Sequence, residues 1–507
     1  MIALKIDTIS IQSYIFGSNK LKENIGGSFI IERLVYWDMI PRALRICGLV
    51  EQINMSEWVM EPDVYQLLIN ENVRVEIGYI GGGNAILIFR YGEDLNLFVR
   101  TYTTLLLQYF PGLNTAYGKY DFEFQEGGDY KNFMRELNEN LIQNRYYYPA
   151  QTVPFKHGIV DDCPWTNEAK EFGVWEEETI YISKMAASKV KLVNLAQEYL
   201  TKKFEEVIGN EFTFTTELEK LGQPADKGYI AIVHADGNGM GQRFMSCQSL
   251  AETRRLSREV GRYADEVMRQ LLTYVVQNRS SLHWEEWDKK DNQTKLPIRP
   301  LILGGDDITF VCEGRLGVHL AEKLLEIMTS VRVGVENITA CAGVAVVHTK
   351  SPFYKAYELT EELTKVAKKA SGDNRVGSWL HFLILTGGFS GSYETIRKTQ
   401  YELPNKRTLK GGPYRVDPDE KSFSSIRKGM SCFAQKWPRN KLKELRDVLR
   451  RGESAQEYFM QEISARNLSL PENANTLWKE DGSTPYYDML ELLDFYPEAL
   501  LKSCDTK

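Results

Sequence analysis

An α+β fold built from two similar halves is predicted by three observations. Short apolar runs of strand type alternate with helical segments in the order β-α-β-β-α-β-α over residues 225–388. Residues 1–130 repeat that order, with glycine-rich turns at matching points. The stretches 131–224 and 389–507 are mainly helical in pattern. The sequence therefore predicts two ferredoxin-like (palm) domains that form an intrachain pseudo-dimer, with helical middle and C-terminal regions.

Each element of the later half has its own signal. "KGYIAIVHADGNGMGQRF" (227–244) starts as a buried strand and ends in a glycine-rich turn. Apolar residues then recur at three- and four-residue steps from Leu256 to Leu271, which predicts an amphipathic helix over 249–277. "LILGGDDITFV" predicts a hairpin, and a helix, the strand "ITACAGVAVVHT", a second helix and the strand "SWLHFLIL" follow.

The earlier half repeats these signals in the same order. "IALKIDTISIQSYIF" predicts a first strand with Asp7 near its end, and "GYIGGGNAILIF" (78–89) predicts the hairpin. The acid pair of the later hairpin is replaced by Gly83 and Asn84, or by Asn84 and Ala85 if the register is shifted by one. Neither alternative offers two carboxylates, so this half is not expected to hold two metal ions unaided.

Composition excludes several classes of protein. The 507 residues are 43% hydrophobic and 26% charged, with a net charge of −7, which is ordinary for a soluble globular protein and gives no overall attraction to nucleic acid. No apolar run approaches the length of a membrane span. Seven cysteines without CxxC spacing favour a reducing cytoplasm over a disulfide framework or a zinc ribbon. The basic segment 427–451 is better explained as a solvated helix face than as a nucleic-acid groove.

Three carboxylates are the strongest candidate site. Asp306 and Asp307 are adjacent at the later hairpin, and Asp236 lies at the end of the strand that neighbours this hairpin in a palm sheet. Two carboxylates pressed together at the end of a sheet repel each other, and a divalent cation resolves that conflict. We therefore predict that Asp236, Asp306 and Asp307 hold two Mg²⁺ or Mn²⁺ ions for phosphoryl transfer.

The neighbouring residues favour a phosphate-bearing substrate. Gly304 and Gly305 would allow a sharp turn and close approach of a triphosphate. Gly237, Asn238 and Gly239 would present backbone amides to phosphate oxygens. Lys368 lies on the helix after the fourth strand, where its ammonium group could reach the donor triphosphate, although exposed lysines are usually only solvated.

These motifs together resemble a known family. "DTISIQSYIFGSNKLKENIGGS", "GGGN", "HADGNGMG", "GGDD" and "AKKASGDNRV" are similar to segments of the palm-domain large subunit of type III CRISPR effector complexes, a relative of GGDEF-type nucleotide cyclases. The resemblance implies a nucleotidyltransferase that converts ATP into cyclic or linear oligoadenylates in antiviral defence. It also implies two ATP molecules between the palms, with the hydroxyl of one attacking the α-phosphate of the other.

The resemblance further implies that the degenerate first palm binds the acceptor nucleotide. Gly82, Gly83 and Asn84 would border that nucleotide. Gly26, Gly27 and Ser28, at the expected start of the helix "SFIIERLVYW", would offer amides to its phosphates, although an ordinary helix start explains them equally well.

The chain also departs from that family. No His-Asp dipeptide occurs, so nuclease activity on single-stranded DNA is not expected, and Cys163 stands alone where relatives often carry a zinc cluster, so no zinc is expected. Effector subunits and guide or target RNA are candidate partners, but the chain could equally act alone, and a monomer suffices because both palms lie in one chain. Two alternatives stay open: a stand-alone cyclic dinucleotide synthase, and a nucleotide- or RNA-binding subunit without turnover.

Overall fold

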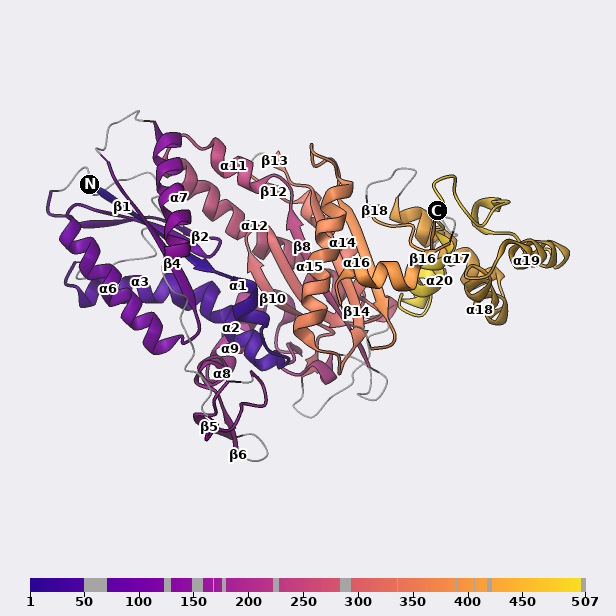
Figure 1. Cartoon of the computed structure of the whole chain (residues 1–507), viewed down its shortest axis with the longest axis horizontal. Helices are drawn as coiled ribbons and strands as arrows, with labels where there is room; N and C mark the ends of the chain where they lie inside the picture. Colours follow the sequence, from indigo (N-terminus) through magenta and orange to yellow (C-terminus); the bar gives the residue numbers. More distant parts are fainter. Residues whose placement is uncertain are drawn as a thin grey trace.

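The computed structural model describes most of the chain. The described residues are 1–49, 71–122, 129–147, 158–166, 168–175, 179–221, 228–282, 293–334, 336–388, 391–404, 406–416 and 422–502. The molecule is elongated, with the N-terminal sheet at one end, the second sheet in the middle and the C-terminal helices at the other end (Figure 1). None of the helices in the described part of the chain combines the length and apolar character that a membrane span requires.

The first palm contains a four-stranded antiparallel sheet in the order β2-β3-β1-β4. Its strands are β1 (Ile2–Ile9), β2 (Val75–Gly81), β3 (Asn84–Phe89) and β4 (Asn114–Asp121). Its helical segments are α1 (Ile11–Phe16), α2 (Leu21–Phe29), the π-helix η1 (Ile30–Asp38), α3 (Met39–Ile46), α6 (Gly92–Tyr109) and α7 (Tyr130–Tyr147). Successive residues of β1 face opposite sides, so Leu4 packs with α3 and α6, whereas Ala3 packs with Leu137 of α7.

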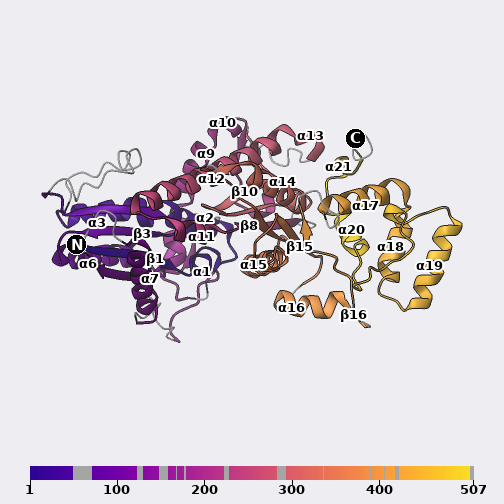
Figure 2. The ribbon, with the colours of Figure 1, turned by 90° about the horizontal axis from the view of Figure 1, so that it is seen from above.

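The second palm repeats this order and adds two strands, giving β10-β11-β8-β14-β15-β18. Its strands are β8 (Tyr229–Gly237), β10 (Ile298–Gly304), β11 (Asp307–Glu313), β14 (Ala340–His348), β15 (Trp379–Leu385) and β18 (Tyr414–Arg415). Its main helices are α11 (Met240–Ser246), α12 (Leu250–Gln277), α14 (Gly317–Ser330) and α15 (Phe353–Ala370). Figure 2 shows α12 and α14 on one side of this sheet and α15 on the other, so both faces are covered.

The strand registers confirm the predicted duplication. Asp236 of β8 lies opposite Asp307 of β11, and at the same place in the first sheet Asp7 of β1 lies opposite Asn84 of β3. The acid pair therefore corresponds to Gly83 and Asn84, the first of the two registers allowed by the sequence. The α+β fold and the two palm sheets are as predicted.

The remaining segments surround the two palms. In the chain, the segment that connects the first palm to the second contains the hairpin of β5 (Phe172–Trp175) and β6 (Thr179–Ile182), helices α8 (Lys184–Val190), α9 (Val193–Lys203) and α10 (Glu205–Ile208), and the short strand β7 (Phe212–Thr213). After α12 come α13 (Arg279–Leu282) and β9 (Thr294–Lys295). The C-terminal region contains α16 (Tyr393–Ile396), α17 (Phe423–Lys436), α18 (Arg439–Val448), α19 (Glu453–Ala465), α20 (Tyr486–Leu492) and α21 (Glu498–Lys502).

Two sequence expectations differ from the structure. The stretch 131–224 was expected to connect the palms, but its first helix, α7, which begins at Tyr130, packs on β4 of the first palm. The packing is close: a Cβ added at Gly118 of β4 would lie 2.8 Å from the Cβ of Leu141. The motif Gly26–Ser28 lies inside α2 and not at a helix start, so that prediction is wrong. The expected boundaries at 224 and 389 fall on residues outside the described ranges.

Candidate functional site: a cleft between the two palms

A cleft of about 1290 Å³ lies between the palms and contains both glycine-rich hairpins. The later hairpin contributes Gly304 to Asp307, and Asp236 lies beside it. The earlier hairpin contributes Gly81 to Asn84 from the opposite palm. The acids and the degenerate hairpin, which are far apart in the sequence, therefore face one shared space.

The three predicted acids meet at the end of the second sheet. Asp236 and Asp307 are opposite each other in β8 and β11, and Asp306 lies in the turn, where its carbonyl accepts a 3.1 Å hydrogen bond from the amide of Gly237. Gly305 has a φ of +82°, a conformation that favours glycine. Gly237 must also be small, because a Cβ there would lie 2.8 Å from the Cβ of Asp306.

The charges at this site are only partly compensated. Burial and the neighbouring Asp236 raise the pKa of Asp306 to about 7. Asp307 Oδ1 is buried and accepts no hydrogen bond, although His234 Nδ1 lies 3.2 Å away. Burial disfavours the charged form of His234, but the surrounding carboxylates, Asp307 foremost, together raise the pKa of the imidazole. The acids therefore lack the positive charge that would stabilise them all in the ionised form.

A donor set made only of carboxylate oxygens fits Mg²⁺ or Mn²⁺, which are hard cations that bind carboxylates. Among the described residues, however, no three His, Cys, Asp or Glu side chains converge closely enough to hold a metal ion as they stand. One reason is that Asp236 accepts a hydrogen bond from the ammonium group of Lys368. The side chains would have to turn toward a bound ion.

The first palm keeps a counterpart of this ion pair. Arg145 of α7 donates to Asp7, as Lys368 of α15 donates to Asp236. Each cation is the sixteenth residue of its helix. The duplication therefore extends beyond the sheets to a cation that holds the aspartate of the first strand.

Several predicted phosphate-binding residues have other roles. Gly26 packs against α8, where an added Cβ would lie 2.0 Å from the carbonyl oxygen of Lys189. Together with Phe29, residues Gly26, Gly27 and Ser28 form the last four residues of α2. Their backbone amides therefore lie within the helix and are not directed at a ligand. Ser28 lines the cleft, but its hydroxyl donates to the carbonyl of Leu301.

The second glycine-rich turn is also less open than predicted. Asn238 is buried, and both of its amides are occupied next to the start of β14: the backbone amide donates to the carbonyl of Thr339 at 2.7 Å, and the side-chain amide donates to Thr339 Oγ1 at 3.0 Å. Gly239 precedes the short helix α11 with a φ of +77°. Residues Gly26, Gly27, Gly237, Asn238, Gly239 and Lys368 do not line the cleft.

Sequence reasoning missed the residues that hold the first hairpin. Tyr36 donates to the carbonyl of Gly83 and is hydrogen-bonded to Thr8 at 2.6 Å, while Tyr79 donates to the side-chain oxygen of Asn84. Tyr36 and Tyr79 both line the cleft. Their positions among apolar residues indicated core packing, and nothing in the one-dimensional pattern pointed to the hairpin.

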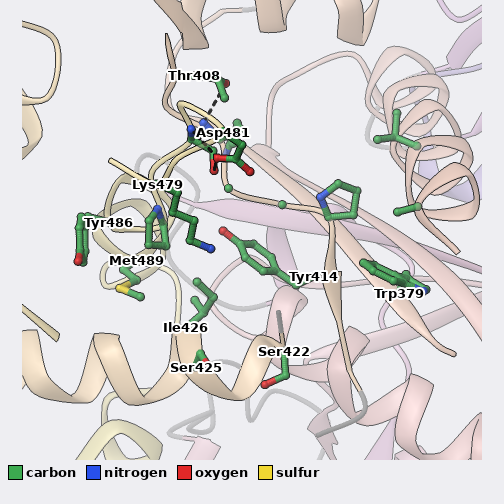
Figure 3. A pocket seen from close by; sticks show the side chains of 18 of the residues that line it. Trp379, Thr408, Tyr414, Ser422, Ser425, Ile426, Lys479, Asp481, Tyr486 and Met489 are labelled. Atoms are coloured by element: carbon green, nitrogen blue, oxygen red, sulfur yellow. Dashed lines mark hydrogen bonds between the residues drawn. The ribbon is translucent and has the colours of Figure 1, made fainter. Parts of the chain in front are cut away.

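A second cavity of about 530 Å³ lies between the second palm and the C-terminal helices, and Figure 3 shows Tyr414 and Lys479 at it. It shares no lining residue with the cleft. One of its lining residues, Lys410, donates to Asp488 at 2.7 Å and to Glu491 at 2.8 Å. This network joins the C-terminal helices to the second palm and is separate from the acids.

The fold and site define a two-palm protein with one acid-bearing palm and one degenerate palm. Residues 229–377 match the family model described as Cas10/Cmr2, second palm domain. The second palm is thus similar to the corresponding domain of the large subunits that its motifs resemble.

Solved structures support the same fold over the whole chain. Csm1 of T.onnurineus is 13% identical with a TM-score of 0.55, and the match covers 99% of this chain and 69% of Csm1. A Csm1-Csm4 cassette in complex with cA4 is also 13% identical, with a TM-score of 0.54 and the same coverage. A Csm1-Csm4 cassette in complex with one ATP is 14% identical, with a TM-score of 0.53, and covers 99% of this chain and 70% of that chain. No curated protein matches the sequence.

Proposed function

We propose that this protein is a nucleotidyltransferase that joins ATP molecules into cyclic or linear oligoadenylates. The observation that carries the proposal is the single cleft that contains both the acid hairpin and the degenerate hairpin. Two nucleotides bound in one cleft, one on each palm, could react with each other without leaving the protein. The cA4 and ATP found in the structurally similar Csm1-Csm4 cassettes support this choice of substrate.

The reaction is a phosphoryl displacement. The 2′- or 3′-hydroxyl oxygen of the acceptor nucleotide forms a bond to the α-phosphorus of the donor ATP, the bond from that phosphorus to the α,β-bridging oxygen breaks, and pyrophosphate leaves with the electron pair. The hydroxyl proton passes to water. Asp236, Asp306 and Asp307 would hold Mg²⁺ or Mn²⁺ ions, which when bound neutralise charge on the attacking and leaving oxygens.

The first palm would position the acceptor. Tyr36 and Tyr79 fix the tip of its hairpin, so Gly82 and Gly83 present backbone to the cleft in a set conformation. Both glycines have positive φ, at +58° and +76°. Because Gly82 and Gly83 carry no carboxylate, the metal ions would bind only at the second palm. The donor ATP would therefore bind at the second palm and the acceptor nucleotide at the first.

The test is to incubate purified protein with ATP and Mg²⁺ or Mn²⁺ and to identify products by mass spectrometry. Oligoadenylates or adenylate cycles from the wild type, and none from the Asp306→Asn/Asp307→Asn double variant, are expected. Cyclic dinucleotides from mixed nucleotides would favour the dinucleotide synthase. Nucleotide binding without product, also after addition of RNA and effector subunits, would favour the binding subunit.

Lys368→Met is expected to lower kcat/KM for ATP by about 10- to 100-fold, the size of one charge-assisted hydrogen bond. We propose that Lys368 leaves Asp236 when the donor triphosphate and its cations bind, and then contacts the triphosphate. Lys369→Met is the matched control, because Lys369 is the next residue and is exposed. Equal loss in both variants, or none in Lys368→Met, would contradict this role.

A further inference from the structure

We infer that helix α12 sets the separation between the acceptor and donor nucleotides. Ser257 is the positioning residue for the degenerate hairpin of the first palm (Gly81 to Asn84), called the acceptor hairpin below. This inference rests on the proposed function and identifies what holds the two halves of the site in register. Helix α12 belongs to the second palm by sequence, yet it contacts the hairpins of both palms. Its residues Ser257, Arg258, Val260, Gly261, Arg262 and Asp265 line the cleft.

The first contact anchors α12 to β2, the edge strand of the first palm. Arg254 is fully buried and donates to the carbonyls of Gly78 at 2.6 Å and Ile77 at 2.8 Å. It also lies 3.1 Å from the carboxylate of Glu76. The register of β2 shifts between Ile77 and Tyr79, and this irregularity turns two carbonyls toward one guanidinium group.

The next contact reaches the acceptor hairpin itself. The hydroxyl of Ser257 donates to the carbonyl of Ile80 at 3.1 Å. Gly81 follows, and a Cβ added there would lie 2.1 Å from Ser257 Oγ. Gly81 has an ordinary φ, so its glycine is explained by the lack of space beside Ser257 and not by the backbone conformation. The two residues before Gly82 and Gly83 are therefore held directly against α12.

The third contact reaches the acid-bearing hairpin of the second palm (Gly304 to Asp307), called the donor hairpin below. A Cβ added at Gly305 would lie 2.8 Å from the side chain of Val260, and Tyr263 donates to the carbonyl of Met328 in α14 at 2.8 Å. Ser257 and Val260 are three residues apart, a rise of about 4.5 Å along a helix axis. One turn of a 28-residue helix thus touches both hairpins.

This arrangement matters because joining two nucleotides requires an accurate approach of the attacking oxygen. A displacement of about 1 Å can reduce the rate about 100-fold. A helical turn is a stiffer spacer than a loop, since each of its backbone groups is hydrogen-bonded along the axis. Ser257 touches neither nucleotide in this scheme and acts through the hairpin that it holds.

The experiment compares a variant that introduces a steric clash with a double variant that removes it. Gly81→Ala places a methyl group against Ser257 Oγ, whereas the Cβ of Ser257 lies 3.4 Å from the added atom, which is an ordinary contact. Gly81→Ala is expected to lower kcat about 10- to 100-fold, with a smaller change in KM. Adding Ser257→Ala is expected to restore most of kcat, and Ser257→Ala alone is expected to cause only a mild loss. Gly452→Ala is the control, because an added Cβ there meets nothing within 4 Å.

A second readout separates this inference from the proposed function. Binding of α,β-methylene-ATP, which cannot release pyrophosphate, is measured by calorimetry with Mg²⁺ for each variant. Two bound nucleotides are expected for the wild type, weaker binding of one of them in Gly81→Ala, and recovery in the double variant. If the wild type makes no product but this binding pattern appears, the proposed function fails and the spacer role stands. Unchanged kcat and binding in Gly81→Ala, or no relief by Ser257→Ala, would overturn the inference.

Discussion

Asp306→Asn is expected to raise the melting temperature of the metal-free protein at pH 8, although the proposed reaction requires the carboxylate of Asp306. In the folded protein, burial and Asp236 raise the pKa of Asp306 from an ordinary value of 3.8 to about 7. The folded state therefore binds more protons than the unfolded state between about pH 4 and pH 7. Stability of the wild type must fall as pH rises through that window. The neutral amide removes this penalty.

The measurement is thermal unfolding at pH 5 and pH 8, without and with Mg²⁺. The advantage of the Asn variant should be large at pH 8 and small at pH 5, where the wild-type carboxyl group is mostly protonated. Mg²⁺ should stabilise the wild type more than the variant, because only the wild type keeps the full carboxylate set. Asp447→Asn, at an exposed position on α18, is the control. A metal-free variant that is less stable than the wild type at pH 8 would contradict the account of this site.

Arg254→Met is expected to destabilise the contact between the palms by about 3–5 kcal/mol. The side chains of Arg254 and Glu76 are 1% and 8% exposed, so the substitution leaves Glu76 buried without its partner. It also leaves the carbonyls of Gly78 and Ile77 without the donors that now satisfy them. Methionine keeps much of the side-chain volume, so the loss reports charge and hydrogen bonding more than packing.

Hydrogen exchange of β2 and thermal unfolding would measure this effect. Faster exchange in β2 is expected for Arg254→Met, and adding Glu76→Gln should recover part of the stability because it removes the unpaired charge. Arg255→Met is a matched control, since Arg255 is the next residue and is exposed. A loss below about 1 kcal/mol, within the range of surface pairs, would mean that α12 does not depend on this arginine.

Much of the fold followed from local patterns. The alternation in β1 and the three- and four-residue apolar steps in α12 predicted their types, and the repeated order of elements predicted the second sheet from the first. Asp236 and Asp307 were predicted to meet because the first and third strands of a palm are neighbours, and the register confirms this. These predictions succeeded because each depends on periodicity or on one simple topology.

Other predictions failed where tertiary contacts decided the outcome. Gly26 looked like part of a phosphate-binding helix start, but it is glycine because α8 leaves no room for a Cβ. Asn238 was expected to present its backbone amide to a phosphate, but that amide donates to the carbonyl of Thr339 at 2.7 Å. Glycine and asparagine serve turns, close packing and ligand contact alike, so their sequence context alone does not distinguish these uses.

By itself, the sequence determined the two-palm plan, the three acids and the loss of the acid pair in the first palm. Only the tertiary structure decided that the two hairpins share one cleft and that Lys368 and Arg145 hold equivalent aspartates. It alone revealed that one turn of α12 touches both hairpins. The physical reason is that periodicity reports which face of an element is buried, whereas these contacts join residues up to 177 positions apart, and no local pattern records which partner a buried face meets.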